Sequence, residues 1–579
     1  MKHLLALAAL CCLVVNLAGC SRFHPGQDRL VYKTRMTAML ADEVPNILKT
    51  YDPKTGHLGT GYFVMNDQMP IYALAVAYAT PGTKCHKDPQ LLEAIMRVGD
   101  VFVDNQDANG KWRFDKKDGS YWGQAYLAWP LARWVRAYGL VQNDMPPDRR
   151  ERWERSLAKA YAGVAKGGFG SYHMSSASHA LGLYLAGDAL GRPEWKAQAA
   201  DYMRRLAEAQ SEAGYWSEHS GPVVHYGFVF IDALGTYYAL SRDEAVLPAL
   251  RNAAVFQSNF TYPDGTNIET VDERPLDRDT VDPGNVGLTF TPEGRAFLDR
   301  QWETRKWKID PDIMASLVLY GEEGEMARPA AHHGFVLHDK GEPRALTMRK
   351  GPWFVAMSGY TAPLSDSRWV QDRQSFVSIW NESAGLIAGG GNTKLQPAWS
   401  SFTVGDCSLL KHAPGDEKPD FKPRSGLYHV PAEAKLVGWK EPRLELVYGP
   451  VACRIDIQAR RSHVDYIVSA SGQTDLPVQA HLTLLPRMGA PIATAGGFSG
   501  VTGKDPVDLD AAAVGGWIQY NGMKMVLPEG TELHWPALPH NPFVKNGHAG
   551  PEEGRIELRI PLKPNGESKT VRIERAPGI

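Results

Sequence analysis

The chain has 579 residues, more than one hydrophobic core usually organises, which indicates two or three domains. Lys and Arg total 63 against 65 Asp and Glu, so no global field attracts nucleic acid or anionic lipid, and nucleic acid is not an expected partner. The 16 Trp and 23 Tyr suit sugar stacking and equally suit the cores of large enzymes.

The first twenty residues have the pattern of an export signal. Lys2 and His3 precede an almost unbroken apolar run over residues 4–17, which is short for a membrane span but suits a secretory signal. Leu17-Ala18-Gly19-Cys20 then resembles the bacterial lipobox. We therefore expect cleavage before Cys20 and acylation of its thiol, with an ordinary signal peptide and a chance cysteine as the alternative.

This N-terminus also predicts a location. Residues 1–19 are expected to be the signal peptide, and residues 20–35 a linker after the lipidated Cys20. Ser21 follows the cysteine in place of Asp, which favours the outer membrane in enterobacteria-like sorting. No later segment reads as apolar enough to span a bilayer, so the acyl chains are the expected contact with the membrane. The protein is thus predicted to be lipid-anchored in the cell envelope, on the periplasmic or surface face.

Helical spacing of apolar residues dominates residues 36–328. Amphipathic helices are predicted at residues 72–78, 91–102, 121–138, 150–164, 178–190, 195–210, 228–240 and 244–256. Three similar turns follow such helices: Asn109-Gly110-Lys111-Trp112, Ala213-Gly214-Tyr215-Trp216 and Asp264-Gly265-Thr266-Asn267. Their glycines lie 104 and 51 residues apart, or two units and one unit of a repeat. Glycine turns also simply end helices, but the shared spacing and tryptophan favour an α/α toroid.

Short alternating runs broken by Gly and Pro replace this pattern near residue 330. Strands are predicted at residues 335–337, 353–357, 376–380, 444–448, 453–458, 464–469, 478–484 and 556–560. Helices followed by strands indicate separate domains, so residues 329–579 are predicted to form an antiparallel β-sandwich after the toroid of residues 36–328.

Three cysteines remain once Cys11 and Cys12 leave with the signal and Cys20 is acylated. Cys407 and Cys453 lie in the strand-rich half and can form a disulfide in an oxidising compartment, whereas Cys85 is expected to be a buried structural thiol. The sequence has no CxxC pair or His-rich tract, and the pair His332-His333 is a weak metal signal. Neither a metal nor another cofactor is predicted.

Residues with acid–base chemistry gather between residues 173 and 274, at turns that a toroid would point toward its central cleft. They are His173, His179, Glu218, His219, His225, Tyr226, Asp264, Glu269, Asp272, Glu273 and Arg274. A lone His or Tyr at a helix start is more often a cap or a core residue, but loops on a rigid scaffold commonly carry function.

Residues 178–240 resemble the heparinase II/III-like polysaccharide lyases and their alginate-lyase relatives. The matching elements are His179 ahead of Leu183-Tyr-Leu-Ala-Gly187, Arg192-Pro193-Glu194-Trp195, Gly214-Tyr215-Trp216-Ser217-Glu218, and Ser220-Gly221-Pro222 leading to His225. The resemblance implies a helical toroid joined to a β-sandwich, and cleavage of an acidic, uronate-containing polysaccharide by β-elimination. The chain departs from the family at Ser178, where an Asn is usual, and at Val224, where a Tyr often precedes the His.

The resemblance also implies roles for individual residues. β-Elimination removes the proton at C5 of a uronate, neutralises the neighbouring carboxylate and protonates the leaving oxygen at C4. Tyr226 is the expected acid, and a candidate base, with His225 or His179 as its partner. The candidates for substrate binding are Gln124 and Arg274 for the carboxylate, Trp216 for stacking on a sugar ring, and Glu218, which would alternatively orient His225 or cap the following helix.

Two other functions fit nearly the same residues. α/α toroids also carry glycoside hydrolases, which need two carboxylates about 5–10 Å apart. Glu218, Asp232, Asp264, Glu269, Asp272 and Glu273 supply enough acids for such a pair. The departures at Ser178 and Val224 favour a third hypothesis, a non-catalytic glycan-binding surface lipoprotein.

The lipobox generates the first testable prediction. Cys20→Ser removes the thiol that would receive the lipid, so the variant is expected to be exported or retained as a precursor but never acylated. Uptake of a labelled fatty acid measures this directly. Labelling of the variant at the wild-type level would contradict the assignment of Cys20.

Overall fold

The computed structural model describes residues 28–59, 64–116, 118–274, 281, 284–304, 308–328, 334–410, 412, 415–423 and 426–577. Cys20, the predicted signal peptide, residues 20–27 of the predicted linker and His332-His333 lie outside these ranges, as do residues 329–333 around the predicted domain boundary. Within the described ranges, no helix combines the length and the apolar character needed to cross a membrane. The exact domain limits stay a prediction.

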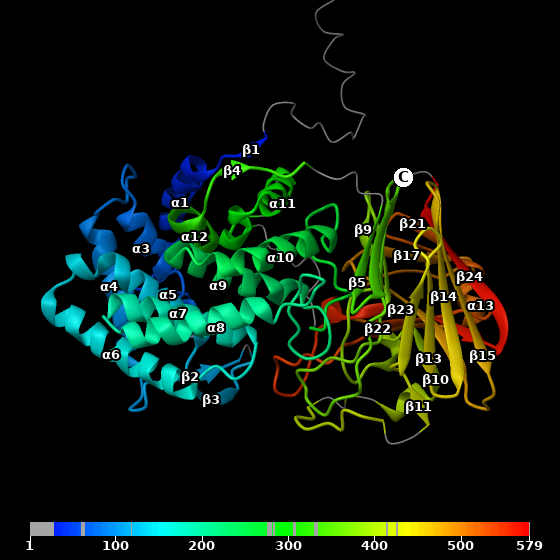
Figure 1. The fold of residues 1–579 in the computed structure, drawn as a ribbon. Helices are drawn as coiled ribbons and strands as arrows, with labels where there is room; N and C mark the ends of the chain where they lie inside the picture. The colour runs from blue at the N-terminus through cyan, green and yellow to red at the C-terminus, as the bar shows by residue number, and fades with distance from the viewer. Residues whose placement is uncertain are drawn as a thin grey trace, which may run out of the picture.

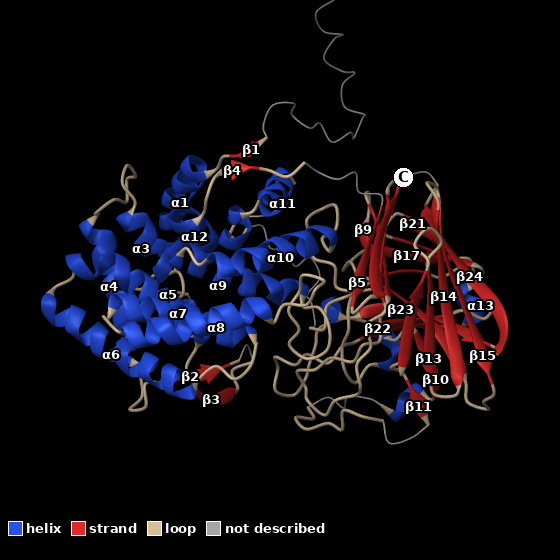
Figure 2. Ribbon diagram, viewed as in Figure 1, coloured by secondary structure: helices blue, strands red, loops and turns tan. Residues whose placement is uncertain are grey.

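The first half of the chain is helical and the second half is built from strands (Figure 1; Figure 2). The α-helices described in the first half are α1 (Lys33–Leu48), α2 (Val64–Asp67), α3 (Ile71–Ala79), α4 (Pro89–Asp104), α5 (Ala128–Val141), α6 (Pro147–Gly167), α7 (Met174–Ala189), α8 (Pro193–Glu208), α9 (Val224–Ser241), α10 (Leu247–Asn259), α11 (Pro292–Glu303) and α12 (Pro311–Tyr320), and the second half has the short α13 (Ala511–Val514). The predicted helices at residues 72–78, 91–102, 150–164, 178–190, 195–210, 228–240 and 244–256 are confirmed within a few residues at each end. Helices α1, α2, α11 and α12 were not predicted.

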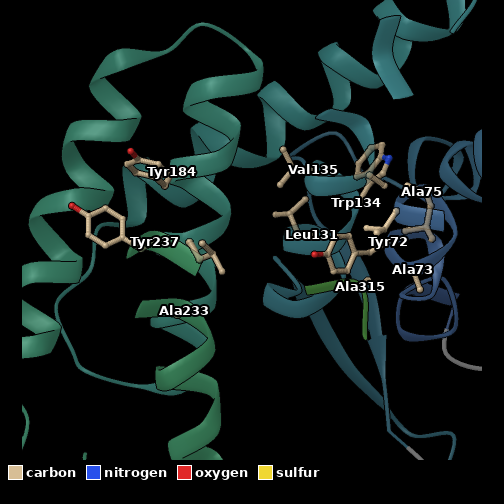
Figure 3. Packing of buried hydrophobic residues seen from close by; sticks show 14 of the residues in the cluster. Tyr72, Ala73, Ala75, Leu131, Trp134, Val135, Tyr184, Ala233, Tyr237 and Ala315 are labelled. Carbon is tan, nitrogen blue, oxygen red and sulfur yellow. The ribbon is translucent and has the colours of Figure 1, made fainter. Parts of the chain in front are cut away.

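Helices α3, α5, α7 and α9 pack against one another in that order, and α12 contacts both α9 and α3. This succession closes on itself, which is the arrangement of an α/α toroid. Residues 71–78 of α3 are buried on every side of the helix, as expected for a helix enclosed by neighbours. Figure 3 shows Tyr72, Trp134, Tyr184 and Tyr237 in the shared core.

The predicted repeat is visible in the hydrogen bonding of its turns. Gly110, Gly214 and Gly265 adopt φ values of +80°, +87° and +92°, which glycine tolerates best. In two of the turns the tryptophan indole donates back to the preceding helix over the same span. Trp112 Nε1 donates to the Phe102 carbonyl at 2.8 Å, and Trp216 Nε1 donates to the Leu206 carbonyl, also at 2.8 Å. Each tryptophan therefore ties its turn to the helix that precedes it.

A hairpin interrupts the helical half and corrects one prediction. Residues 121–125 do not begin a helix; they form β3 (Tyr121–Ala125), which pairs with β2 (Trp112–Asp115). Helix α5 starts only at Ala128. The tight turn at Gly119 (φ +80°) and the aromatic run Tyr121-Trp122 suit a hairpin better than a helix start.

The second half is a sandwich of two antiparallel sheets. The larger sheet has 11 strands: β5 (Gly334–Asp339), β6 (Glu342–Lys350), β7 (Trp353–Ser358), β8 (Val377–Asn381), β9 (Gly385–Ala388), β10 (Phe402–Gly405), β11 (Leu427–Tyr428), β16 (Val478–Leu484), β19 (Val507–Leu509), β22 (Glu532–Ala537) and β23 (Arg555–Leu562). The smaller has nine: β12 (Glu433–Val437), β13 (Arg443–Tyr448), β14 (Val451–Ala459), β15 (His463–Gly472), β17 (Pro491–Thr494), β18 (Ser499–Val501), β20 (Trp517–Tyr520), β21 (Met523–Val526) and β24 (Asn565–Arg575). Burial alternates along β14, so one face of this strand meets the other sheet. Each predicted strand coincides with or overlaps an observed one.

The disulfide prediction is wrong in this structure, because Cys407 and Cys453 are both free thiols. Cys453 faces the core between the sheets. Cys407 lies beside Thr403, which stands between the core residues Phe402 and Val404 of β10 and therefore points to the opposite face of the sheet. Cys85 is buried, as predicted.

The repeat turn generates a stability prediction. Gly214→Ala places a methyl group against the Asn252 carbonyl oxygen at a φ of +87°, so we expect a loss of about 2 kcal/mol or more in the free energy of unfolding. Gly139→Ala in α5 is the matched control, because a Cβ there meets no atom within 4 Å. It should stabilise the protein by about 0.5–1 kcal/mol. Denaturant unfolding of both variants is the measurement, and equal effects would contradict the turn geometry.

Candidate active site

Two of the predicted catalytic residues lie in the first turn of α9. His225 and Tyr226 follow Val224, the first residue of the helix, and both are half-buried with ring centroids 5.5 Å apart. The residue at the N-cap, Val223, has no side chain that can accept the free N–H groups of the turn. The first turn therefore depends on an acceptor from elsewhere in the chain.

Asp272 supplies that acceptor from 48 residues downstream. Its Oδ2 accepts the backbone N–H of Val224 at 2.6 Å and that of His225 at 3.2 Å, while its Oδ1 accepts the N–H of Arg274 at 2.7 Å. The side chain is fully buried, and this burial raises the pKa of Asp272 to about 6, although the three N–H donors favour the charged form. Asp272 thus caps the helix that carries His225 and Tyr226.

Glu273 organises the loop that leads into α9. One carboxylate oxygen accepts the N–H groups of Glu218 at 2.7 Å and His219 at 2.9 Å, and the other accepts that of Ser220 at 2.5 Å. Three successive N–H groups converging on one carboxylate wrap the loop around it. The side chain of Glu273 is only 4 % exposed, so these bonds are shielded from water.

Arg274 joins the loop to the candidate acid. Its Nε donates to Glu218 Oε2 at 2.6 Å, its Nη2 lies 3.2 Å from His173 Nε2, and its Cζ lies 5.2 Å from the ring centroid of Tyr226. The guanidinium is buried, so water screens its interactions with the Glu218 carboxylate and the Tyr226 ring only weakly. Burial lowers the pKa of His173, although the Glu218 charge opposes that shift. The family resemblance gives His173 no role, and the one sequence signal for it is its position just before a predicted helix.

Glu218 has a different role from the predicted ones. Its carboxylate is fully buried, forms an ion pair with Arg274 and accepts the N–H of Met174 at 3.3 Å. Met174 is the first residue of α7, so Glu218 caps a helix that precedes it in the chain rather than α9. With its carboxylate buried and used in these contacts, Glu218 is poorly placed to bind substrate.

The prediction that Trp216 stacks on a sugar ring is wrong. Trp216 is 1 % exposed and stacks on Phe230 inside the helical core, with ring centroids 5.4 Å apart. Gln124 is exposed, as a substrate-binding residue requires, but it lies on β3 rather than on the predicted helix. Its role in carboxylate binding stays a prediction.

His179 lies inside α7 and is largely buried. Burial lowers its pKa to about 4, so the imidazole is neutral at neutral pH and is a weak base. Its Nδ1 has no hydrogen-bond partner in the structure. Of the two predicted partners for Tyr226, His225 is the one that lies beside it on the same helical turn.

The acids proposed for a hydrolase are engaged within the protein. Glu269 is buried and accepts bonds from Tyr262 and Gly390, and Asp264 accepts from Thr266 and from the indole of Trp380. Asp232 pairs with Arg136 at 3.5 Å. Together with Asp272, Glu273 and Glu218, all six carboxylates have protein partners.

In the described part of the chain, one group of three residues has the spacing of a metal site. It consists of Glu218, His219 and Glu273, each with one potential ligand atom within 4.8 Å of the others. The hydrogen bonds and the ion pair described above already use both carboxylates. The expectation that no metal is required stays a prediction.

No protein-family model and no curated protein matches this sequence. Among solved structures, a xanthan lyase of Paenibacillus matches over 94 % of this chain and 57 % of its own, with 11 % identity and a TM-score of 0.53. A chondroitin AC lyase of Streptomyces coelicolor A3, solved with chondroitin sulphate, matches over 94 % and 79 %, with 12 % identity and a TM-score of 0.53. A mutant of the heparan sulfate lyase HepC from Pedobacter heparinus matches over 96 % and 85 %, with 11 % identity and a TM-score of 0.46.

The first two matches show that this chain has the fold of these lyases, a helical toroid followed by a β-sandwich. The chain spans little more than half of the length of the xanthan lyase. At this identity the likeness is one of fold, so the assignment of a function depends on the site itself.

The cap supplied by Asp272 is directly testable. Asp272→Asn replaces one of two accepting oxygens by an NH₂ group that faces backbone donors, so we expect a loss of about 2 kcal/mol in the free energy of unfolding. Asp88→Asn is the matched control, because Asp88 is an exposed cap that accepts the N–H of Gln90, and Asn caps helices equally well. A destabilisation by Asp272→Asn no larger than that of the control would refute the role of Asp272.

Proposed function

We propose that this protein is a polysaccharide lyase that cleaves an acidic, uronate-containing glycan by β-elimination. One observation carries the proposal: the phenol of Tyr226 lies at the start of α9 with a buried guanidinium, that of Arg274, over its ring. The fold shared with two polysaccharide lyases supports the same conclusion.

The arrangement suits the proton transfers of β-elimination. A positive charge beside a phenol stabilises the phenolate, so the Arg274 guanidinium helps Tyr226 to give up its proton to the leaving oxygen at C4. The same phenolate, or the neighbouring His225 imidazole, can accept the proton from C5. The ion pair with Glu218 holds the guanidinium in place over the Tyr226 ring.

A hydrolase is less well supported by the same geometry. Hydrolysis needs one carboxylic acid and one carboxylate that both reach the glycosidic bond. The buried acids Glu218, Glu269, Asp272 and Glu273 instead accept hydrogen bonds from their own chain.

Both departures from the lyase resemblance fall at buried positions. Ser178 and Val224 are both buried, at 7 % and 0 % exposure, so neither side chain is available to a polysaccharide. Their identities therefore do not favour a non-catalytic protein. Of the two residues predicted to bind the substrate carboxylate, Arg274 is only 5 % exposed and is paired with Glu218, which leaves Gln124 on the exposed hairpin as the candidate.

We also propose that the protein acts in the cell envelope, anchored through a lipid on Cys20 to the outer membrane. The lipobox-like Leu17-Ala18-Gly19-Cys20 and the following Ser21 support this proposal. A polysaccharide too large to enter the cytoplasm would then meet the enzyme outside it.

Substitution of Tyr226 tests the mechanism. Tyr226→Phe removes only the phenolic oxygen, so folding should survive while turnover falls by roughly 10²- to 10⁴-fold. His225→Ala should be similarly severe. The measurement is a screen of uronate-containing glycans, read by the ultraviolet absorbance of the unsaturated product and by product mass, with melting temperature as the control for folding.

Asp264→Asn is the matched control, because Asp264 would serve a hydrolase but has no part in the lyase mechanism. It should be mild in a lyase and severe in a hydrolase. Near wild-type turnover by Tyr226→Phe would exclude Tyr226 as the acid, and products without the ultraviolet chromophore would exclude a lyase.

A further inference from the structure

One arginine from the sandwich half reaches the loops of the candidate site. Arg373 precedes β8 and is 1 % exposed. Its Nη1 donates to the Val271 carbonyl at 2.7 Å, and its Nη2 donates to the Ser220 carbonyl at 3.1 Å. Figure 2 shows the loops that fill the region between the helices and the sheets.

The two carbonyls belong to different segments of the site. Ser220 lies in the loop that wraps Glu273, and Val271 directly precedes Asp272, the cap of α9. A single planar guanidinium therefore ties both segments together, with a donor for each. The loop leaves room for it at Gly221, where an added Cβ would lie 2.7 Å from Arg373 Nη2 and where φ is +116°.

A second residue of the sandwich half reinforces this link. Asn392 Nδ2 donates to the Asp272 carbonyl at 3.1 Å. Its Oδ1 accepts the N–H of Gln374 at 3.0 Å and that of Ser375 at 3.1 Å, immediately after Arg373. The segment that carries Arg373 is thereby fixed to the segment that carries Asp272.

We propose that Arg373 is a positioning residue for the active site, which sets the placement of His225 and Tyr226 through the two loops and the Asp272 cap. Arg373 itself touches no reacting atom. The geometry of a catalytic turn in the helical half then depends on a side chain from the sandwich half. The activity measurements below rest on the proposed lyase function, whereas the exchange measurement does not.

The kinetic test uses Arg373→Ala in the full chain. A displacement of catalytic groups by about 1 Å can cost about 10²-fold in rate, so we expect kcat to fall by roughly 10- to 100-fold with little change in KM. Guanidinium ion at low millimolar concentration should restore part of the loss, because it can donate to the same two carbonyls. Arg373→Lys should retain intermediate activity, since an ammonium keeps the charge but loses the planar fork.

Arg295→Ala is the matched control. Arg295 also donates to two backbone carbonyls, those of Thr289 and Glu325, but it ties α11 to β4 (Gly324–Glu325). It should lower the melting temperature without changing kcat, and guanidinium should restore no activity. An Arg373→Ala enzyme with wild-type kcat, or the same kinetic response in both variants, would overturn the proposal.

Amide hydrogen exchange tests the positioning role without any substrate. In Arg373→Ala, the N–H groups of residues 218–220 and 224–225 should lose protection, because the loops and the cap are loosened. Asn392→Asp keeps the shape of the side chain but cannot donate to the Asp272 carbonyl, so it should reduce protection at residues 224–225. This variant serves as the test if Arg373→Ala fails to fold. Unchanged protection at these sites would overturn the proposal. Loss of protection in a protein that cleaves no uronate glycan would support positioning and refute the lyase function.

Discussion

The candidate site depends on two adjacent buried carboxylates. Asp272 and Glu273 together accept six backbone N–H groups, from residues 218–220, 224, 225 and 274. A carboxylate in a medium of low polarity is costly unless donors satisfy it, and unpaired backbone N–H groups at a helix start carry the same kind of cost. The acids and the loop thus satisfy each other. The direction in which α9 presents His225 and Tyr226 follows from that mutual requirement rather than from the helix alone.

The sandwich half contacts the candidate site through Arg373 and Asn392, and it also contacts the hairpin of β2 and β3. There Lys116, next to the hairpin of β2 and β3, lies 5.1 Å from the ring centroid of Trp369 and 5.5 Å from that of Phe543, while Trp122 and Trp369 are 5.5 Å apart. The Lys545 N–H donates to Asp118 at 2.7 Å. Because Trp369 and Arg373 lie in the same loop, the contact of Trp369 with the hairpin and the hydrogen bonds of Arg373 to the loops of the candidate site belong to one interface. Each half has a hydrophobic core of its own, and a third apolar cluster, which includes Tyr215 and Tyr360, contains residues of both halves.

Much of the fold could be predicted because its signals are local. Residues 195–210 have apolar residues at helical spacing, and residues 453–458 have them at alternate positions. Each pattern arises because one face of the helix or strand is buried, so it can be recognised from the sequence alone. The spacing of Gly110, Gly214 and Gly265 predicted the repeat because each turn needs a positive φ. The hairpin at residues 121–125 was missed because its strands are short and run into a helix of strong apolar character. The clustering of His225, Tyr226 and Arg274 was found because the turns of a toroid collect at one end.

By itself, therefore, the sequence determined the order of a helical and a strand-rich half, most elements within them and the chemical types gathered near residues 218–226. Tertiary structure decided which of those side chains are available. From the sequence, Trp216 and Glu218 are candidates for ligand binding. In the structure Trp216 stacks on Phe230 and Glu218 forms an ion pair with Arg274, so neither is available to a ligand. Arg373 gave no local signal, because its partners lie about 100 and 150 residues away along the chain. Burial and hydrogen bonding over such separations depend on how the helical half and the sandwich half pack together. The spacing of apolar residues within a single helix or strand does not determine that packing.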